Sequence, residues 1–276
     1  MIERHYQNFN IPYTEKMLDR FENNLLPKRI ASVQRLNGGE VLGGSINPAI
    51  KAFGESIILS SPHQTCIRHL NLVKELGAAN FAYVINEGIT FKTHIDGHTI
   101  ELTGQPKTDY VDTDSWIKVH CAAVMLRDFD AVNILNLVSE ATFISANLRP
   151  DSFDLALVDI LKGIFQGDSD LATLLEKALL CDDIDDMRLP YAHHILSPLL
   201  PLVRCIFTAN AEAEFNQELR EAVAMHKAYW SKDELEAQGW VSLPLTALAV
   251  IAKDAKGYKM SFETDYIPAW IVNREF

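Results

Sequence analysis

Three side chains that can bind a metal ion occur at regular spacing: His63, Cys66 and His69. Intervals of three residues place them near one face of a helix, where imidazole and thiolate groups are suitable soft ligands. A fourth ligand is not visible in the surrounding sequence, and a closed zinc site needs four. We therefore expect packing roles and no bound metal; a metal-dependent hydrolase that uses these side chains is kept as an alternative.

Other catalytic motifs are incomplete. The glycine-rich stretch GGEVLGGS at 38–45 lacks the lysine of a phosphate-binding loop, whose position is taken by Gly44, and no strand-like segment precedes it. A flexible connector between helices is the simpler interpretation. The chain also has no Gly-x-Ser-x-Gly elbow, and no serine, cysteine or lysine is placed by sequence beside a base. These observations argue against an enzyme, with no catalytic residue and no cofactor expected.

Acidic side chains are concentrated in the middle of the chain. The formal net charge is −12, yet residues 1–100 carry 10 basic and 9 acidic groups, whereas residues 101–190 carry 7 and 17. Such a surface repels nucleic acid and attracts basic proteins, because like charges sum to a long-range field. The run CDDIDD at 181–186 lacks the spacing and the glycine of a calcium-binding loop. It is therefore either a solvated face or part of a partner-binding surface.

We assign the partner-binding role, as a hypothesis, to six aspartates that we expect on loops at one end of a helical stack. They are Asp168, Asp170, Asp182, Asp183, Asp185 and Asp186. The electrostatic fields of these carboxylates would add at a basic cleft of the partner. Most of the affinity would come from a few apolar contacts nearby, because exposed ion pairs contribute only about 0 to 1 kcal/mol each.

The composition is that of a globular protein. With 276 residues, 48% of them hydrophobic, the chain is long enough for a sizeable core. No stretch reaches 18 consecutive apolar residues, and the N-terminal residues lack the apolar segment of a signal peptide. We therefore expect a cytoplasmic protein that does not enter a membrane. The four cysteines are far apart in the sequence, which favours reduced, buried thiols over disulfides.

The periodicity predicts a mainly α fold: a compact multi-helix stack with one small β-hairpin near 90–102. Helical spacing of apolar residues covers 47–59, 62–85, 113–127, 130–146, 151–166, 169–181, 190–207, 210–230 and 232–238, the last with a capping box, SKDE, at 231–234. The hairpin is predicted because Asp96-Gly97 tolerates the positive φ angles of a tight turn. We expect a single domain, 1–276, made of an N-terminal helical and hairpin part, 1–105, and a helical core, 106–276.

The C-terminal stretch WVSLPLTALAVIAKDAKG, from Trp240 on, is predicted to contain a buried helix. Ser242 is placed as its N-cap and Pro244 lies in its first turn, while LTALAVIA is apolar nearly all round. Gly257 can end the helix in the left-handed conformation. The following YKMSFETDY alternates like a strand and Pro268 limits further pairing, so we expect a short, strand-like tail.

Four segments carry recognisable motifs. DSWIKVHCAAVMLRD at 114–128 is an apolar helix with a tryptophan that ends in Arg-Asp, and FNQELREAVAMHKAYW at 215–230 ends in His-Lys-x-Tyr-Trp. The C-terminus carries the pair WVSLPLTALAVIAKDAKG and SFETDYIPAWIV. Together they resemble the immunity protein 49 family of bacterial polymorphic toxin systems over residues 105–272, with Thr264 where the family pattern has serine. The residues that match its pattern are Trp116, Arg127, Asp128, His226, Trp230, Ser242, Pro244, Asp265, Tyr266 and Pro268.

The resemblance implies a mainly α-helical, cytosolic antidote that binds and neutralises a cognate toxin delivered between bacteria. Such an inhibitor needs no reactive group, only a surface that occludes the active site of the toxin. The acidic middle of the chain suits a basic nuclease domain, which ordinarily holds phosphates. Residues that match the family pattern are expected to pack the scaffold. A helical adaptor would be the alternative; it would show a repeat of about 34 to 45 residues, which the sequence does not show clearly.

Overall fold

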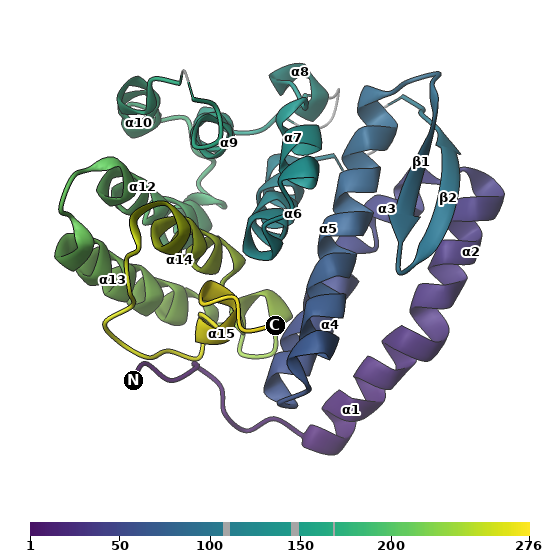
Figure 1. The fold of residues 1–276 in the computed structure, drawn as a ribbon, viewed down its shortest axis with the longest axis horizontal. Helices are drawn as coiled ribbons and strands as arrows, with labels where there is room; N and C mark the ends of the chain where they lie inside the picture. The colour runs from purple at the N-terminus through teal and green to yellow at the C-terminus, as the bar shows by residue number, and fades with distance from the viewer. Residues whose placement is uncertain (107–110, 145–148, 168) are drawn as a thin grey trace. The chain divides into compact units, whose positions relative to one another are not determined.

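The computed structural model describes residues 1–106, 111–144, 149–167 and 169–276. These residues are mainly helical and contain one two-stranded antiparallel hairpin, which confirms the mainly α fold class (Figure 1). The chain divides into two compact units: unit 1 is Met1–Tyr6 with Arg149–Glu275, and unit 2 is Gln7–Leu148 with Phe276. That the whole chain behaves as one domain with an internal boundary at residue 105 stays a prediction.

Unit 2 is built around the long helix α5, which packs against α4 and α6. Its elements are α1 (Ile11–Arg20), the π-helical turn η1 (Phe21–Leu25), α2 (Leu26–Leu36), α3 (Gly39–Gly43), α4 (Ile46–Ile58), α5 (His63–Ile85), β1 (Thr90–Ile95), β2 (His98–Thr103), α6 (Thr113–Leu126), α7 (Phe129–Asn136) and α8 (Glu140–Phe143). The first three follow one another without a break and form the long purple helical segment in Figure 1. The glycine-rich stretch, predicted to be a flexible connector, contains the short helix α3.

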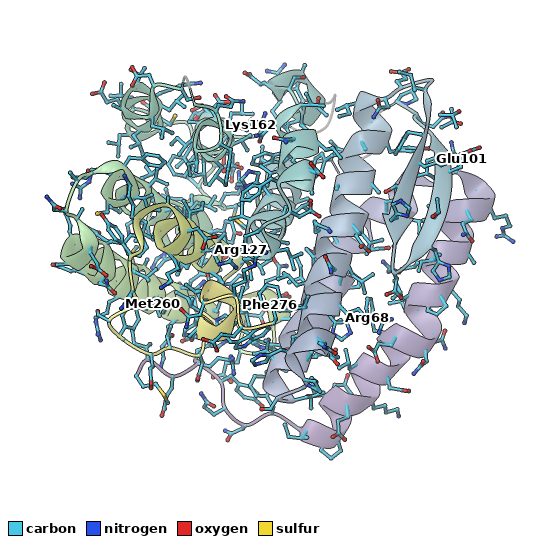
Figure 2. All side chains as sticks on the ribbon, in the orientation of Figure 1. Arg68, Glu101, Arg127, Lys162, Met260 and Phe276 are labelled. Atoms are coloured by element: carbon cyan, nitrogen blue, oxygen red, sulfur yellow. The ribbon has the colours of Figure 1, made fainter. Side chains whose placement is uncertain are left out.

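The hairpin forms as predicted. Ile95 pairs with His98 across a two-residue turn, in which Asp96 and Gly97 have φ angles of 49° and 77°. Arg68 of α5, labelled in Figure 2, donates hydrogen bonds from Nε and Nη2 to the Asp96 carboxylate at 2.8 Å each. Its Nη1 donates to Glu22 of η1 at 2.9 Å. One guanidinium thus ties the hairpin turn and the π-helical turn to α5.

Unit 1 is built around the apolar helix α14, which contacts α12, α13 and α15. Its elements are α9 (Ser152–Gly163), α10 (Leu171–Leu179), α11 (Leu189–Tyr191), the π-helical turn η2 (Ala192–Leu196), α12 (Leu199–Phe207), α13 (Glu212–Trp230), the 3-10 turn η3 (Ala237–Gly239), α14 (Leu243–Lys256) and α15 (Ala269–Val272). Side chains from Leu245 to Ala252 are buried without exception, as expected for a helix that is apolar nearly all round. Gly257 ends α14 with φ 73°, which confirms the predicted left-handed cap.

The tail after α14 is irregular, and the expected strand is reduced to a single parallel bridge between Thr264 and Ile2. The backbone of the tail is occupied elsewhere, since the side-chain amide of Asn216 accepts from the Ser261 N–H at 2.6 Å and donates to the Lys259 carbonyl at 2.9 Å. A helix side chain therefore takes the backbone groups that a neighbouring strand would have paired.

Three predicted helices are wrong in extent. The helix expected over 130–146 ends at Asn136, and a separate short helix, α8, starts at Glu140; residues 145 and 146 lie outside the described ranges. The helix expected over 190–207 is divided into α11, η2 and α12, because Pro198 begins a new helix as its N-cap. The predicted helix over 232–238 is absent: residues 232–236 form turns and bends that lead into η3, since the Ser231 hydroxyl donates to the Lys227 carbonyl instead of capping a new helix.

Packing of α5 against α6 depends on Gly77. A Cβ atom at this position would lie 2.1 Å from Cγ2 of Val119, so the two helices approach to a distance that only glycine permits. We expect Gly77→Ala to lower the free energy of unfolding by about 1 to 3 kcal/mol through overpacking. Gly167→Ala is the matched control, because nothing lies within 4 Å of its added methyl group. Urea unfolding of both variants measures the difference; equal stability would contradict the close approach of α5 and α6.

Candidate partner-binding site

The loop between α10 and α11, residues 180–188, is fastened to the N-terminal end of α9. The Asp183 carboxylate accepts hydrogen bonds from the Ser152 N–H at 3.1 and 3.2 Å and from the Ser152 hydroxyl. The hydroxyl hydrogen bond of Ser152 lowers the pKa of Asp183, so this carboxylate stays ionised as a helix cap. At Asp185, the backbone N–H donates to the Asp151 carboxylate at 3.4 Å. An acidic loop thus supplies the cap for a helix far from it in the sequence.

Arg188 closes the same loop. Its Nη1 lies 2.5 Å from Oδ2 of Asp151 and 2.7 Å from Oδ2 of Asp154. The Asp154 side chain is only 2% exposed, so its charge needs a cation beside it. The Arg188 and Leu189 N–H groups both donate to the Asp185 carbonyl, which starts the helical path into α11. The loop is therefore held at Asp183, at Asp185 and, at its end, at Arg188.

Large apolar side chains are exposed in this loop and at its two ends. Leu179 is 73% exposed, Leu180 82% and Met187 89%, and Leu189 is also exposed. Burying a side chain of this kind contributes about 1.5 to 3 kcal/mol, so a partner that covers them gains binding free energy. Sequence periodicity missed this feature, because it placed the two leucines inside an amphipathic helix. The signal that was available is the apolar residues on both sides of an acidic run.

The structure separates the five described aspartates of the hypothesis into two roles. Asp170 and Asp183 cap helices: Asp170 accepts from the Thr173 N–H at 3.2 Å and from its hydroxyl at 2.7 Å, and the hydroxyl lowers the pKa of Asp170. Asp185 accepts from the Met187 N–H at 2.8 Å. Within the described part of the chain, the exposed carboxylates of Asp182 and Asp186 have no hydrogen-bond or ion-pair partner.

The sixth aspartate, Asp168, lies outside the described residues. Among the described members of the set, Asp182 and Asp186 are the two whose carboxylates have no partner within the described residues. The other described members also hold the loop and its neighbouring helices in place.

In unit 2, the residues that match the family motif hold a helix corner. Trp116 is fully buried, stacks on His120 with ring centroids 4.6 Å apart, and donates from Nε1 to the Leu135 carbonyl at 3.0 Å. Arg127 ends α6 with φ 56°. Asp128 caps α7 through the Ala131 N–H at 3.0 Å and pairs with Lys74 of α5 at 2.6 Å. Arg127 therefore ends one helix and Asp128 caps the next, and the two residues do not form a reactive pair.

In unit 1, His226 and Tyr266 form the centre of a buried aromatic cluster. Their ring centroids are 5.0 Å apart, and Trp230 lies 6.2 Å from His226 on its own helix. His226 donates from Nε2 to the Gly239 carbonyl at 3.1 Å. Burial lowers the pKa of His226 to about 4 and raises that of Tyr266 to about 12, so both rings are neutral near pH 7.

The N-terminal residues dock onto this cluster. Tyr266 accepts a hydrogen bond at its hydroxyl from the His5 N–H at 2.6 Å. Arg4 donates from Nε to the Trp240 carbonyl at 2.8 Å and from its N–H to the Asp265 carboxylate at 2.9 Å. Asp265 and Tyr266 therefore fix the start of the chain to its end. Sequence analysis assigned no role to these first residues, because nothing local in the sequence indicates their distant partners.

The remaining motif positions mark helix starts. Ser242 stands at the N-cap of α14 as predicted, and its N–H donates to the Tyr266 carbonyl at 2.9 Å. Its buried hydroxyl has no partner among the described residues, so the predicted side-chain cap is wrong. Pro244 lies in the first turn of α14, and Pro268 is the N-cap of α15. These prolines suit helix starts because they lack the N–H that a first turn leaves unpaired.

The candidate metal ligands of α5 have other contacts. His69 is fully buried and its Nε2 lies 2.9 Å from Glu22, while the Cys66 thiol donates to the Ser61 carbonyl at 3.6 Å. His63, by contrast, is exposed. Over residues 1–106, 111–144, 149–167 and 169–276, no three histidine, cysteine, aspartate or glutamate side chains converge in a way that could hold a metal ion. The hydrolase alternative gains no support from this arrangement.

Among the described residues, no helix combines the length and the apolar character that crossing a membrane requires.

The fold and the site define a mainly helical protein whose motif residues hold its helices together and whose most unusual surface is a fastened acidic and apolar loop. The family model of immunity protein 49 matches residues 59–271, and the chain belongs to this family. Membership gives it the role of an immunity protein, whose partner is a toxin. The match begins earlier than the sequence motifs indicated, so that α5 and the hairpin are part of the family region. Comparisons with curated proteins and with solved structures gave no match.

The buried neutral His226 makes stability depend on pH. Its pKa is about 4 in the folded chain and 6.5 when exposed, so the unfolded chain binds the proton more tightly. The stabilisation is fully present above pH 6.5 and is lost as the pH falls towards 4, by about 3 kcal/mol. We expect His226→Gln, which keeps a donor for Gly239, to lose less stability between pH 7 and pH 5 than the wild type does. Urea unfolding at both pH values tests this; equal losses would contradict it.

Proposed function

We propose that this protein neutralises a cognate antibacterial toxin in the cytosol by binding it stoichiometrically and covering its active site, without catalysis of its own. The observation that carries the proposal is the family match over residues 59–271. An inhibitor of this kind requires a complementary surface and no reactive group. The motif residues of the chain are consistent with that requirement, because they serve as caps, turns and packing groups.

We propose further that the toxin is a nuclease with a basic active-site cleft. Residues 101–190 carry 17 acidic and 7 basic groups, and a nuclease must present lysine and arginine side chains to phosphates. An acidic surface competes for the same side chains and attracts the toxin over distances comparable to the Debye length, about 8 to 10 Å at physiological salt. Within this surface, Asp182 and Asp186 are the groups we assign to the toxin-facing side, because their charges are not used inside the loop.

The direct test uses the C-terminal domain of the protein encoded by the gene beside this one. Co-expression of that domain with the immunity protein should rescue bacterial growth. Equimolar mixing of the two purified proteins should abolish the activity of the domain on nucleic acid. A domain that stays active in a stable mixture with excess immunity protein would contradict the proposed neutralisation, and an active domain without nuclease activity would contradict the nuclease assignment alone.

The electrostatic contribution is tested with the double variant Asp182→Asn and Asp186→Asn. We expect association with the toxin domain to slow by about threefold or more at low salt and to depend less on ionic strength, because charge steering acts on the association rate. Asp183 and Asp185 are left in place, since they hold the loop. Stopped-flow association over a range of salt concentrations is the measurement.

The matched control removes two exposed carboxylates of unit 2, in the double variant Glu15→Gln and Glu87→Gln. It has the same net charge as the test variant, so any effect of total charge appears in both. If both variants show the same salt dependence, the acidic loop is a solvated face and the toxin binds elsewhere.

A further inference from the structure

We infer that Leu179, Leu180 and Met187 are the anchor side chains of the toxin-binding surface and that Arg188 is a positioning residue that holds them in the binding geometry. The inference rests on the proposed function and adds to it the residues that supply affinity. Charges such as Asp182 guide the encounter, whereas apolar side chains that become buried on binding slow dissociation.

The anchors belong to one short segment whose backbone is held at two points. Leu180 is three residues before Asp183, and Met187 is two residues after Asp185. Both aspartates contact the first residues of α9, through Ser152 and Asp151. An extended chain advances about 3.5 Å per residue, so the backbones of Leu180 and Met187 stay within about 11 Å of the aspartate that holds the chain next to each of them. Leu179 directly precedes Leu180, so all three exposed side chains lie within residues 179–187.

The loop is ordered by polar contacts, and the apolar side chains take no part in them. Asp183, Asp185 and Arg188 use their polar groups on α9, while Leu180 and Met187 remain 82% and 89% exposed. A backbone that is already held in place loses little conformational entropy when a partner binds. Exposed apolar side chains on such a backbone are therefore suited to binding, because the backbone that carries them is already ordered before the partner binds.

The partner that this group fits is a basic protein surface with an apolar depression. Asp182 and Asp186 lie close to the anchors in the sequence, and both side chains are exposed. A partner that covers the leucines and the methionine must accept these carboxylates at the rim, which favours lysine or arginine side chains there. This charge pattern disfavours a second copy of the chain, whose own loop would bring like charges together.

The anchors are tested with the double variant Leu180→Ala and Met187→Ala against the toxin domain of the adjacent gene. We expect the dissociation rate to rise by about tenfold or more and the association rate to change little. The control is Leu137→Ala with Leu235→Ala, which truncates two side chains that are 71% and 67% exposed on other parts of the chain. The control should change the dissociation rate by less than about twofold.

The outcomes separate the inference from the function on which it rests. Failure of the wild type to bind the domain would overturn both. Tight binding by the wild type together with equal dissociation rates for the two double variants would overturn the anchors and leave the immunity function standing. A wild type that is a dimer by light scattering, and that the anchor variant converts to a monomer with unchanged toxin binding, would reassign the surface to a second copy.

The positioning role of Arg188 is tested with Arg188→Gln, which leaves every anchor side chain in place. We expect faster amide hydrogen exchange over residues 180–187 and weaker toxin binding, because a smaller fraction of molecules presents the anchors correctly. Arg188→Lys, which keeps the positive charge, should recover part of both. If Arg188→Gln does not fold, Ser152→Ala weakens the same loop by removing the hydroxyl that binds Asp183. Unchanged exchange or unchanged binding in the folded variant would overturn the positioning role.

Discussion

A single buried carboxylate fixes the path of the loop at residues 180–188 in unit 1. Asp154 lies in the first turn of α9 with almost no exposure, and a charge in that position must have a cation beside it. The cation is Arg188, which is distant in the sequence, so the chain between them has to return to the start of α9. Removing one partner of such a pair costs about 3 kcal/mol or more, which makes the return of the loop a requirement of the fold. The acidic run is brought to α9 by the same contact.

The residues that identify the family and the residues that face solvent at the loop have different roles. Trp116, His226 and Tyr266 are buried and neutral, and they join segments that are far apart in the sequence. Trp116 and His226 donate to backbone carbonyls, and the Tyr266 hydroxyl bonds both the N–H and the ring of His5, which specifies the positions of neighbouring segments. A motif of this kind marks a scaffold. The residues that we propose for partner binding lie on the exposed loop, where no motif residue is found.

Sequence patterns predicted the parts of the fold that depend on local interactions. The helix α5, the Asp96-Gly97 turn and the cap at Gly257 follow from periodicity and from backbone preferences within a few residues. The failures have distant causes. The predicted strand is lost because Asn216, about forty residues before it, binds its backbone. The buried appearance of Leu179 and Leu180 in the pattern is misleading, because α10 packs mainly on α9 and buries Ala178 in its last turn, whereas the two leucines after it are exposed. Periodicity shows which face of a helix is apolar, but it does not show where the covering helix ends.

In the loop, the residues that hold the backbone in place differ from the residues whose apolar side chains are exposed, and this difference matters for specificity. The loop is held by Asp183, Asp185 and Arg188, and none of these contacts involves an apolar side chain of the loop. Side chains that are fully exposed contribute little to stability, with typical effects of substitution within about 0.5 kcal/mol. The displayed residues can therefore change without loss of the fold, whereas the fastening residues cannot. If the loop binds the toxin as proposed, substitutions at a few exposed positions redirect the scaffold to a different toxin, since neither the helices nor the loop path has to change.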